Sequence, residues 1–170
     1  VTVYDSLIYN QNSLFDCCAN NKFNFIEGDI SNEKLIVPIL KKFDVIILLA
    51  AIVGAPACNK NKKLTKLINY IAPKKIIENI SKKQLLIFPT TNSGYGIGGE
   101  AECSETSPLR PISSYGKYKV SIEKIILDKN LGVTLRFATL FGMSPRMRLD
   151  LLVNDFVFKA YFDKYIILFE

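Results

Sequence analysis

The chain has 170 residues, of which 49% are hydrophobic and 22% are charged. This composition predicts a globular domain with a sizeable core, and it excludes disordered and fibrous proteins. The net charge of +6 comes from scattered lysines, not from a basic stripe with interleaved aromatic residues. A solvated surface is therefore favoured over a face that binds nucleic acid.

The residue types narrow the chemistry further. The chain has no histidine, which excludes a Ser-His-Asp triad, an H-E-x-x-H zinc helix and a histidine base within these residues. The four cysteines have neither a C-x-x-C pair nor metal-ligand spacing, so we expect free thiols, no metal site and a cytoplasmic protein. The longest apolar run, residues 45–57, is too short to cross a bilayer, and we expect no membrane partner.

Strands and helices are predicted to alternate along the chain. Short apolar runs, bounded by polar or glycine residues, predict strands, and apolar residues at helical spacing predict helices. Pro38 and Pro73 fall inside two of these helices, and we expect Pro73 to bend or divide its segment. In chain order, the predicted elements are strands at 1–4 and 23–26, a helix at 31–43, a strand at 45–50, a helix at 63–82, a strand at 84–89, a helix at 114–130, a strand at 133–137 and a helix at 149–162.

This alternation predicts an α/β fold, a Rossmann-like doubly wound parallel sheet with right-handed crossovers. The continuous apolar run 45–50 is typical of a parallel strand that is buried on both faces. In open sheets of this kind, ligands bind beyond the carboxyl ends of the strands. The residues that follow each predicted strand should therefore line one crevice, and they are Asp5, Asp29, Ala50, Ala51, Thr90, Thr91 and residues 137–139.

Tyr115 and Lys119 lie four residues apart on a predicted helix and therefore share one face. An ammonium beside a phenol favours the phenolate, so the pair can act as a base near neutral pH without histidine. The alternative is a surface tyrosine packed on a lysine side chain, because a Tyr-x-x-x-Lys pattern also arises by chance.

The wider pattern resembles the NAD-dependent nucleotide-sugar epimerases and dehydratases, which are extended short-chain dehydrogenases. In that family, a catalytic Ser or Thr precedes a strand-exit Tyr-Gly, as Thr91 precedes Tyr95 and Gly96 here. Its Tyr-x-x-x-Lys follows about two dozen residues later, as at Tyr115 and Lys119. Its next strand ends in an Arg-aromatic-x-x-x-aromatic-Gly pattern, which is matched from Arg136 to Gly142.

The resemblance implies NAD as the cofactor. An acid at the ribose hydroxyls, here Asp5, favours NAD over NADP because it would repel a 2′-phosphate. The family also often has an Asn in the helix after the fourth strand, at the position of Asn69. The cofactor-binding residues implied are Asp5, Asp29, Ile30, Leu49, Ala50, Ala51, Tyr115, Lys119 and Phe137.

The resemblance further implies that Thr91, Tyr115 and Lys119 are catalytic. The substrate would be a nucleotide-diphosphate sugar. Asn154 would contact this substrate, and the alternative for Asn154 is a position on the helix surface without such a contact. Arg146 and Arg148 could pair with phosphates, but a solvated role is preferred. The implied substrate-binding residues are Thr91, Asn92, Ser93, Thr139 and Asn154.

The chain also departs from the family pattern. The Gly-x-x-Gly-x-x-Gly motif is absent, and Gly94, Gly96, Gly98 and Gly99 are interpreted as an active-site loop instead. We expect a sheet that is incomplete at both ends, with an NAD-binding domain over 1–147 that lacks its first strand and helix. Residues 148–170 would begin a substrate-binding region.

The resulting hypothesis is an NAD-dependent epimerase that acts through a transient keto sugar. Alternatives within the family are a dehydratase or a dehydrogenase/reductase. The Asp-Glu pair typical of sugar 4,6-dehydratases is replaced by Asn92 and Ser93, which counts against that dehydration. Outside enzymes, the alternatives are an NAD-binding regulatory protein or an inactive truncated fragment. The family often forms homodimers through the helix that bears Tyr-x-x-x-Lys.

Overall fold

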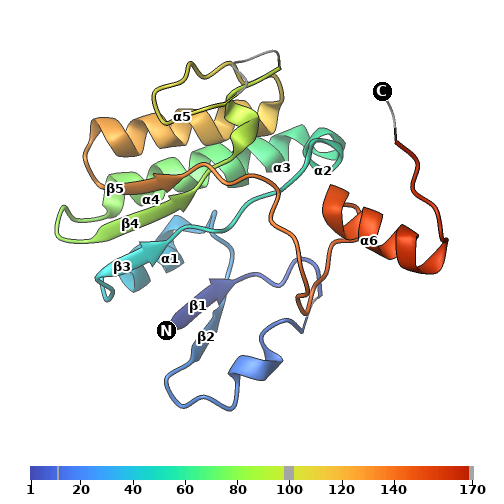
Figure 1. Ribbon diagram of the computed structural model, residues 1–170. Coiled ribbons are helices and arrows are strands. Elements are labelled where there is room, and N and C mark those ends of the chain that lie inside the picture. Colours follow the sequence, from blue (N-terminus) through green and yellow to red (C-terminus); the bar gives the residue numbers. More distant parts are fainter. Residues whose placement is uncertain (11, 98–101, 169–170) are drawn as a thin grey trace. The chain divides into compact units, whose positions relative to one another are not determined.

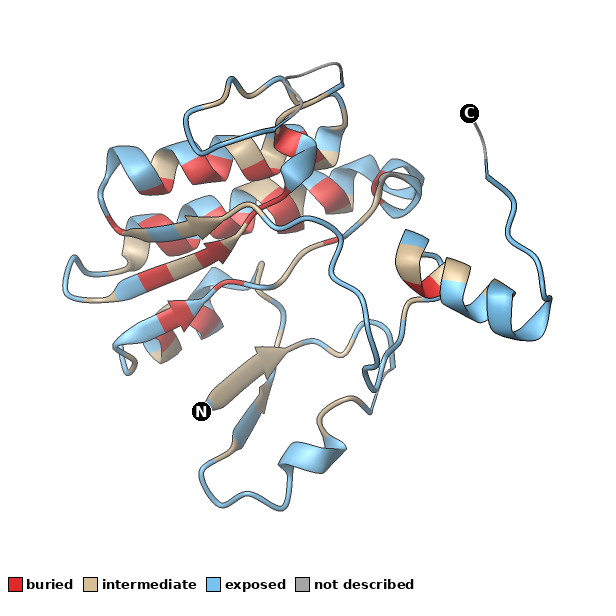
Figure 2. Cartoon of the chain, viewed as in Figure 1, coloured by how far each residue is buried: buried red, intermediate tan, exposed pale blue. Residues whose placement is uncertain are grey.

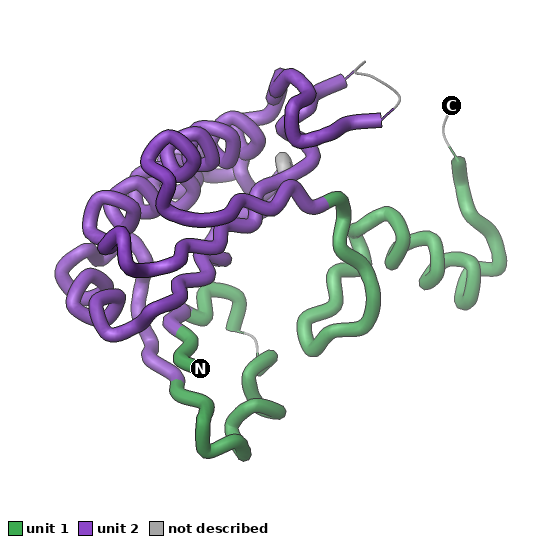
Figure 3. Tube along the Cα trace, turned by 60° about the vertical axis from the view of Figure 1, so that its left-hand side comes forward, with its two compact units in different colours: residues 1–3, 7–24, 138–170 green, residues 4–6, 25–137 purple. Residues whose placement is uncertain are grey.

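The computed structural model describes residues 1–10, 12–97 and 102–168 (Figure 1). Gly98 and Gly99, which belong to the predicted glycine-rich loop, lie outside the described residues. The chain divides into two units (Figure 3). Unit 1 comprises residues 1–3, 7–24 and 138–170, and unit 2 comprises residues 4–6 and 25–137. The predicted domains, 1–147 and 148–170, stay a prediction.

The strands form a three-stranded parallel sheet and a separate two-stranded sheet. The larger sheet has the order β3 (Val45–Ile47), β4 (Leu85–Pro89) and β5 (Gly132–Leu135). Val45 lies opposite Leu85, and Leu86 lies opposite Gly132. The smaller sheet pairs β1 (Thr2–Asp5) with β2 (Asn24–Glu27). The parallel sheet with crossover helices confirms the predicted fold class.

All helices except the last lie in the connections between these strands, and the last follows β5. A short 3₁₀ turn, η1 (Phe15–Cys17), lies between β1 and β2, and a second, η3 (Asn92–Gly94), follows β4. The α-helices are α1 (Glu33–Leu40), α2 (Ala55–Lys60), α3 (Lys62–Lys66), α4 (Ala72–Asn79), α5 (Ser114–Asp128) and α6 (Leu152–Phe162). None of the described helices is both long enough and apolar enough to cross a membrane.

Helix α1 is shorter than the helix predicted at 31–43. Its N-cap is Asn32, because Ser31 is held in the preceding turn, where its backbone N and its Oγ both donate to Asp29 Oδ1 at 2.7 Å. Pro38 lies inside α1, which ends at Leu40. Proline lacks a backbone donor and is poorly tolerated in long helix interiors, which agrees with a helix of 8 residues.

The segment predicted as one helix over 63–82 consists of three parts. A π-helical turn, η2 (Leu67–Ile71), separates α3 from α4, and Pro73 lies in the first turn of α4. The helical backbone continues through η2, where Ala72 N donates to the carbonyl of Leu67, and the irregular turn lies directly before Pro73, which has no N–H to donate. The regular α-helix is thus interrupted next to Pro73 without a break in the helical backbone, in agreement with the expectation that Pro73 bends or divides the segment.

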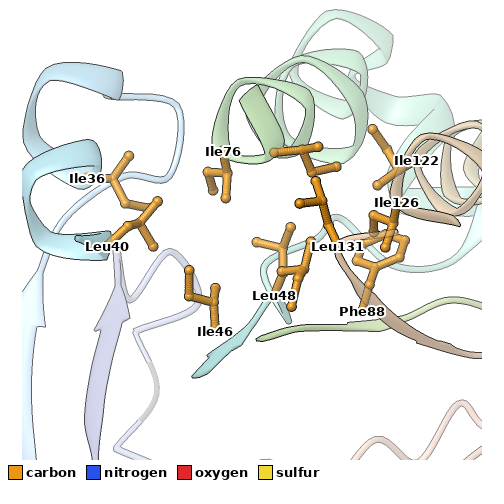
Figure 4. Close-up of a cluster of buried hydrophobic side chains, with 11 residues drawn as sticks. Ile36, Leu40, Ile46, Leu48, Ile76, Phe88, Ile122, Ile126 and Leu131 are labelled. Carbon is orange, nitrogen blue, oxygen red and sulfur yellow. The ribbon is translucent and has the colours of Figure 1, made fainter. Parts of the chain in front are cut away.

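The main core of unit 2 lies between the parallel sheet and helices α1, α4 and α5 (Figure 4). Side chains from β3, β4 and the three helices, together with Leu131 directly before β5, form one continuous cluster, so these helices cover the same face of the sheet. The buried members are Ile36, Leu40, Ile46, Leu48, Ile76, Ile77, Leu86, Phe88, Ile122, Ile126 and Leu131.

The opposite face of the parallel sheet is exposed at β3 and partly exposed at β4 and β5. Ile46 and Leu48 are buried, whereas Val45, Ile47 and Leu49 are 49%, 57% and 67% exposed. Buried and exposed residues accordingly alternate along β3 (Figure 2). The prediction that residues 45–50 are buried on both faces is therefore wrong, because within unit 2 the core forms on one face alone. Four strand residues define what we call the open face: Val45, Ile47, Leu85 and Val133.

Candidate active site

All residues assigned to NAD binding from the sequence lie in unit 2. Each of them lies in or shortly after a strand, or in helix α5. Asp5 ends β1, and Asp29 follows β2. Residues 49–51 follow β3, and Phe137 follows β5. Because β3, β4 and β5 are parallel, their carboxyl ends meet at one edge of the sheet.

A buried asparagine fixes the loop that follows Ala50 and Ala51. The Asn69 amide accepts from the backbone N of Ile52 at 2.8 Å and donates to the carbonyl of Ile52 at 2.8 Å. Asn69 is only 2% exposed and lies in the π-helical turn η2. It therefore substitutes for a strand partner at Ile52, and this contact was not predicted from the sequence.

We expect Asn69→Ala to lower the free energy of unfolding by about 2 kcal/mol, because it leaves the buried N–H of Ile52 without a partner and its carbonyl with only the weak Cys58 Sγ donor at 3.3 Å. Urea denaturation measures the change. Asn59→Ala on the exposed part of α2 is the matched control and should change stability by less than about 0.5 kcal/mol. Equal stability of the Asn69 variant and wild type would show that the hydrogen bonds between Asn69 and Ile52 do not contribute to stability.

Thr91 lies at the exit of β4, where it caps the turn η3. Its Oγ1 accepts from the backbone N of Ser93 at 3.1 Å, and its side chain is largely buried. The backbone N of Asn92 donates to the carbonyl of Phe137 at 2.9 Å, which joins the exits of β4 and β5. The neighbouring Thr90 has a buried Oγ1 with no hydrogen-bond partner among the described residues.

Two glycines bring the turn after Thr91 against helix α5. A Cβ on Gly116 would lie 3.3 Å from the carbonyl oxygen of Ser93, and one on Gly94 would lie 3.0 Å from Val120 Cγ2. Both distances leave little room for a side chain. The start of α5, which carries Tyr115, therefore packs directly on the turn that Thr91 caps.

Lys119 is buried in this contact. Its Nζ donates to the carbonyl of Pro89 at 2.8 Å and lies 6.0 Å from the ring centroid of Tyr115 and 4.4 Å from that of Phe88. The side chain is 4% exposed, and burial lowers its pKa from 10.5 to about 8. A desolvated ammonium is thus held between the end of β4 and the tyrosine ring.

Tyr115 also touches the loop after β3. Its ring packs against a small buried cluster of Ile52, Cys58 and Ile68. The phenol is therefore anchored by groups from η2 and the loop after β3, and its ring lies near Lys119. The structure thus links Thr91, Tyr115 and Lys119 through contacting elements of unit 2, while their catalytic roles stay a prediction.

Two predicted substrate-binding residues, Thr139 and Asn154, lie in unit 1. Thr139 is exposed, whereas Asn154 is 5% exposed. The Asn154 Oδ1 accepts from Gly142 N at 3.0 Å, and its Nδ2 donates to the carbonyl of Arg148 at 3.0 Å. Asn154 therefore fixes the backbone of residues 142–148, and its contact with substrate stays a prediction.

The sequence model of the NAD dependent epimerase/dehydratase family matches residues 1–160. The chain belongs to this family. The match covers both the Tyr115–Lys119 helix and the strand exits on either side of it, so the family resemblance of the motifs is confirmed.

Curated relatives and a solved structure agree with this assignment. The chain is 29% identical over 156 residues to a UDP-glucose 4-epimerase of Streptococcus mutans, covering 85% of this chain and 45% of that protein. It is 31% identical over 147 residues to the uncharacterized UDP-glucose epimerase YtcB of Bacillus subtilis, covering 82% and 45%. The chain thus spans less than half the length of these relatives.

The fold is also found in the UDP-glucuronic acid 4-epimerase of Bacillus cereus, solved in complex with UDP-glucuronic acid and NAD. The TM-score is 0.79 at 27% identity, and the match covers 96% of this chain and 55% of that one.

Proposed function

We propose that the protein is an NAD-dependent epimerase that acts on a nucleotide-diphosphate sugar through a transient keto intermediate. The observation that carries this proposal is the buried ammonium of Lys119, which lies beside Tyr115 on a helix packed against the turn of Thr91. The family supports the reaction class, and the 4-epimerase relatives support the choice of epimerisation.

The residues present fit NAD. Ala50 and Ala51 are small and only partly buried at a strand exit, and Asp5 ends a strand, where folds of this kind place the acid that binds the ribose hydroxyls. Thr90 Oγ1, buried without a partner in the described residues, adds a polar group to the same edge. When bound, NAD⁺ supplies the oxidant that accepts a hydride from the sugar carbon.

Three residues of the chain would take part in the proton transfer, each in a separate role. The Tyr115 phenolate would remove the proton from a sugar hydroxyl, since a nearby cation lowers the pKa of a phenol. Lys119 would supply that cation and hold the phenolate in place. Thr91 would donate a hydrogen bond to the same substrate oxygen and orient it.

The rival activities differ in their products. A dehydratase is less well supported, because the exposed Asn92 and Ser93 cannot protonate a leaving hydroxyl as a carboxylic acid does. A dehydrogenase would release a net oxidised sugar, and an NAD-binding regulatory protein or an inactive fragment would release no product.

NMR analysis of the products formed by the complete gene product from UDP-sugars separates these activities. The proposal predicts inversion of one stereocentre without accumulation of NADH. Stoichiometric NADH would favour a dehydrogenase, and loss of water would favour a dehydratase. No turnover with NAD and any of the UDP-sugars tested would contradict the proposal.

We further propose a cytoplasmic location, in agreement with the free thiols of Cys17, Cys18, Cys58 and Cys103. A homodimer through α5 is proposed from the family resemblance, and size-exclusion chromatography with light scattering tests it.

A further inference from the structure

A buried ion pair joins α5 to the exit of β5. Arg136 Nε and Nη2 donate to Glu123 Oε1 at 2.9 and 2.6 Å. The Glu123 side chain is 2% exposed and that of Arg136 is 16% exposed. The hydrogen bonds to Glu123 raise the pKa of Arg136, so the guanidinium is charged at every accessible pH.

The free edge of the guanidinium binds the polar segment after β4. Arg136 Nη1 donates to Tyr95 Oη at 3.1 Å and to the carbonyl of Glu105 at 3.1 Å. The Tyr95 hydroxyl in turn donates to the carbonyl of Ser104 at 3.0 Å, and Arg136 lies over the Tyr95 ring at 5.2 Å. One side chain therefore binds both Tyr95 and the backbone of residues 104–105.

Tyr95 is one short turn from Thr91. The backbone N of Gly94 donates to the carbonyl of Thr91 at 3.1 Å, and that of Tyr95 donates to the carbonyl of Asn92 at 3.0 Å. A shift of Tyr95 would therefore be passed on to Thr91 through a hydrogen-bonded turn. Glu123, at the other end of the network, is on the same helix as Tyr115 and Lys119.

We propose that Arg136, held by Glu123, is a positioning residue that fixes Thr91 relative to Tyr115. The guanidinium can do this because it presents five donors in a rigid planar fork and binds the helix and the turn at once. It contacts neither substrate nor cofactor in this role. The proposal rests on the proposed function, since it assigns Thr91 and Tyr115 to one reaction.

The sharpest test is Tyr95→Phe in the complete gene product, because it removes one hydroxyl and leaves no buried charge unpaired. We expect kcat to fall about tenfold with unchanged KM for the sugar and unchanged Kd for NAD, since a small misplacement of a reacting group lowers turnover selectively. Arg136→Lys should lower kcat by about 10²-fold, because an ammonium cannot reproduce the planar fork. Tyr118→Phe is the matched control on α5 and should leave kcat unchanged.

Hydrogen exchange supplies a readout that does not depend on activity. In Tyr95→Phe, amides of residues 92–95 and 102–107 should exchange about tenfold faster than in wild type, while those of β4 should not change. A lowered melting temperature with unchanged kcat would indicate a merely structural role and would overturn the proposal. No turnover by the wild type would contradict the proposed function. Independently of turnover, unchanged exchange of the amides of residues 92–95 in Tyr95→Phe would overturn the link from Arg136 to Thr91.

Discussion

Replacing Tyr115 by phenylalanine is expected to lower kcat of the complete gene product by about 10³-fold, because it removes the phenol that takes the substrate proton. The ring packing against Ile52, Cys58 and Ile68 is retained, so the fold and the affinity for NAD should change little. Steady-state kinetics and calorimetric titration with NAD measure the two effects separately.

Tyr118→Phe is again the matched control, since Tyr118 stacks on Tyr70 with a ring-centroid distance of 5.8 Å and keeps that contact as phenylalanine. A Tyr115 variant with wild-type turnover would exclude the phenol as the base. A variant that loses NAD affinity in parallel with turnover would point to a binding role instead.

Lys119→Met is expected to abolish most of the activity and to stabilise the fold at pH 7. Burial lowers the pKa of Lys119 from 10.5 to about 8, so the folded chain carries an energetic cost for its charged form. That cost is about 3 kcal/mol, and losing the hydrogen bond to the Pro89 carbonyl offsets about 1 kcal/mol of the gain. We therefore expect a net stabilisation of about 2 kcal/mol at pH 7.

The difference in stability between Lys119→Met and wild type should depend on pH. Below pH 8 the lysine is protonated in both states, and the cost of burying its charge is fully present. Between pH 8 and 10.5 the unfolded chain binds more protons than the folded chain, so wild-type stability rises with pH. The advantage of Lys119→Met should therefore shrink over this range and reverse above it.

Urea denaturation at pH 7 and pH 10 measures the difference. Lys117→Met, on the exposed face of α5, is the control and should show little dependence of its stability change on pH. A Lys119 variant that is less stable than wild type at pH 7 would mean that the contacts with Pro89, Phe88 and Tyr115 outweigh the burial of charge.

The order of the elements could be predicted because it rests on local pattern. The apolar run 84–89 became β4 at Leu85–Pro89, and the helix predicted at 114–130 became α5 at Ser114–Asp128. Neither assignment depended on what packs against the element. The shared face of Tyr115 and Lys119 followed in the same way from helical geometry.

What the sequence could not provide were contacts between distant residues. Asn69 and Ile52 lie 17 residues apart, and Arg136 and Glu123 lie 13 apart, with no motif that links either pair. Whether an apolar strand is covered on one face or two also depends on the tertiary neighbours, and for this reason residues 45–50 were misjudged. The role of the Asn154 amide in bonding the backbone of residues 142–148 was missed for the same reason.

The open face should affect how readily the protein self-associates in solution. Val45, Ile47, Leu85 and Val133 present an apolar strip to water, and such strips favour self-association. The net charge of +6 opposes the approach of two copies, but salt shortens the reach of that repulsion to about 10 Å at 0.1 M. Dilute buffer of low ionic strength should therefore keep the chain dispersed, whereas added salt should promote clustering through β3, β4 and β5.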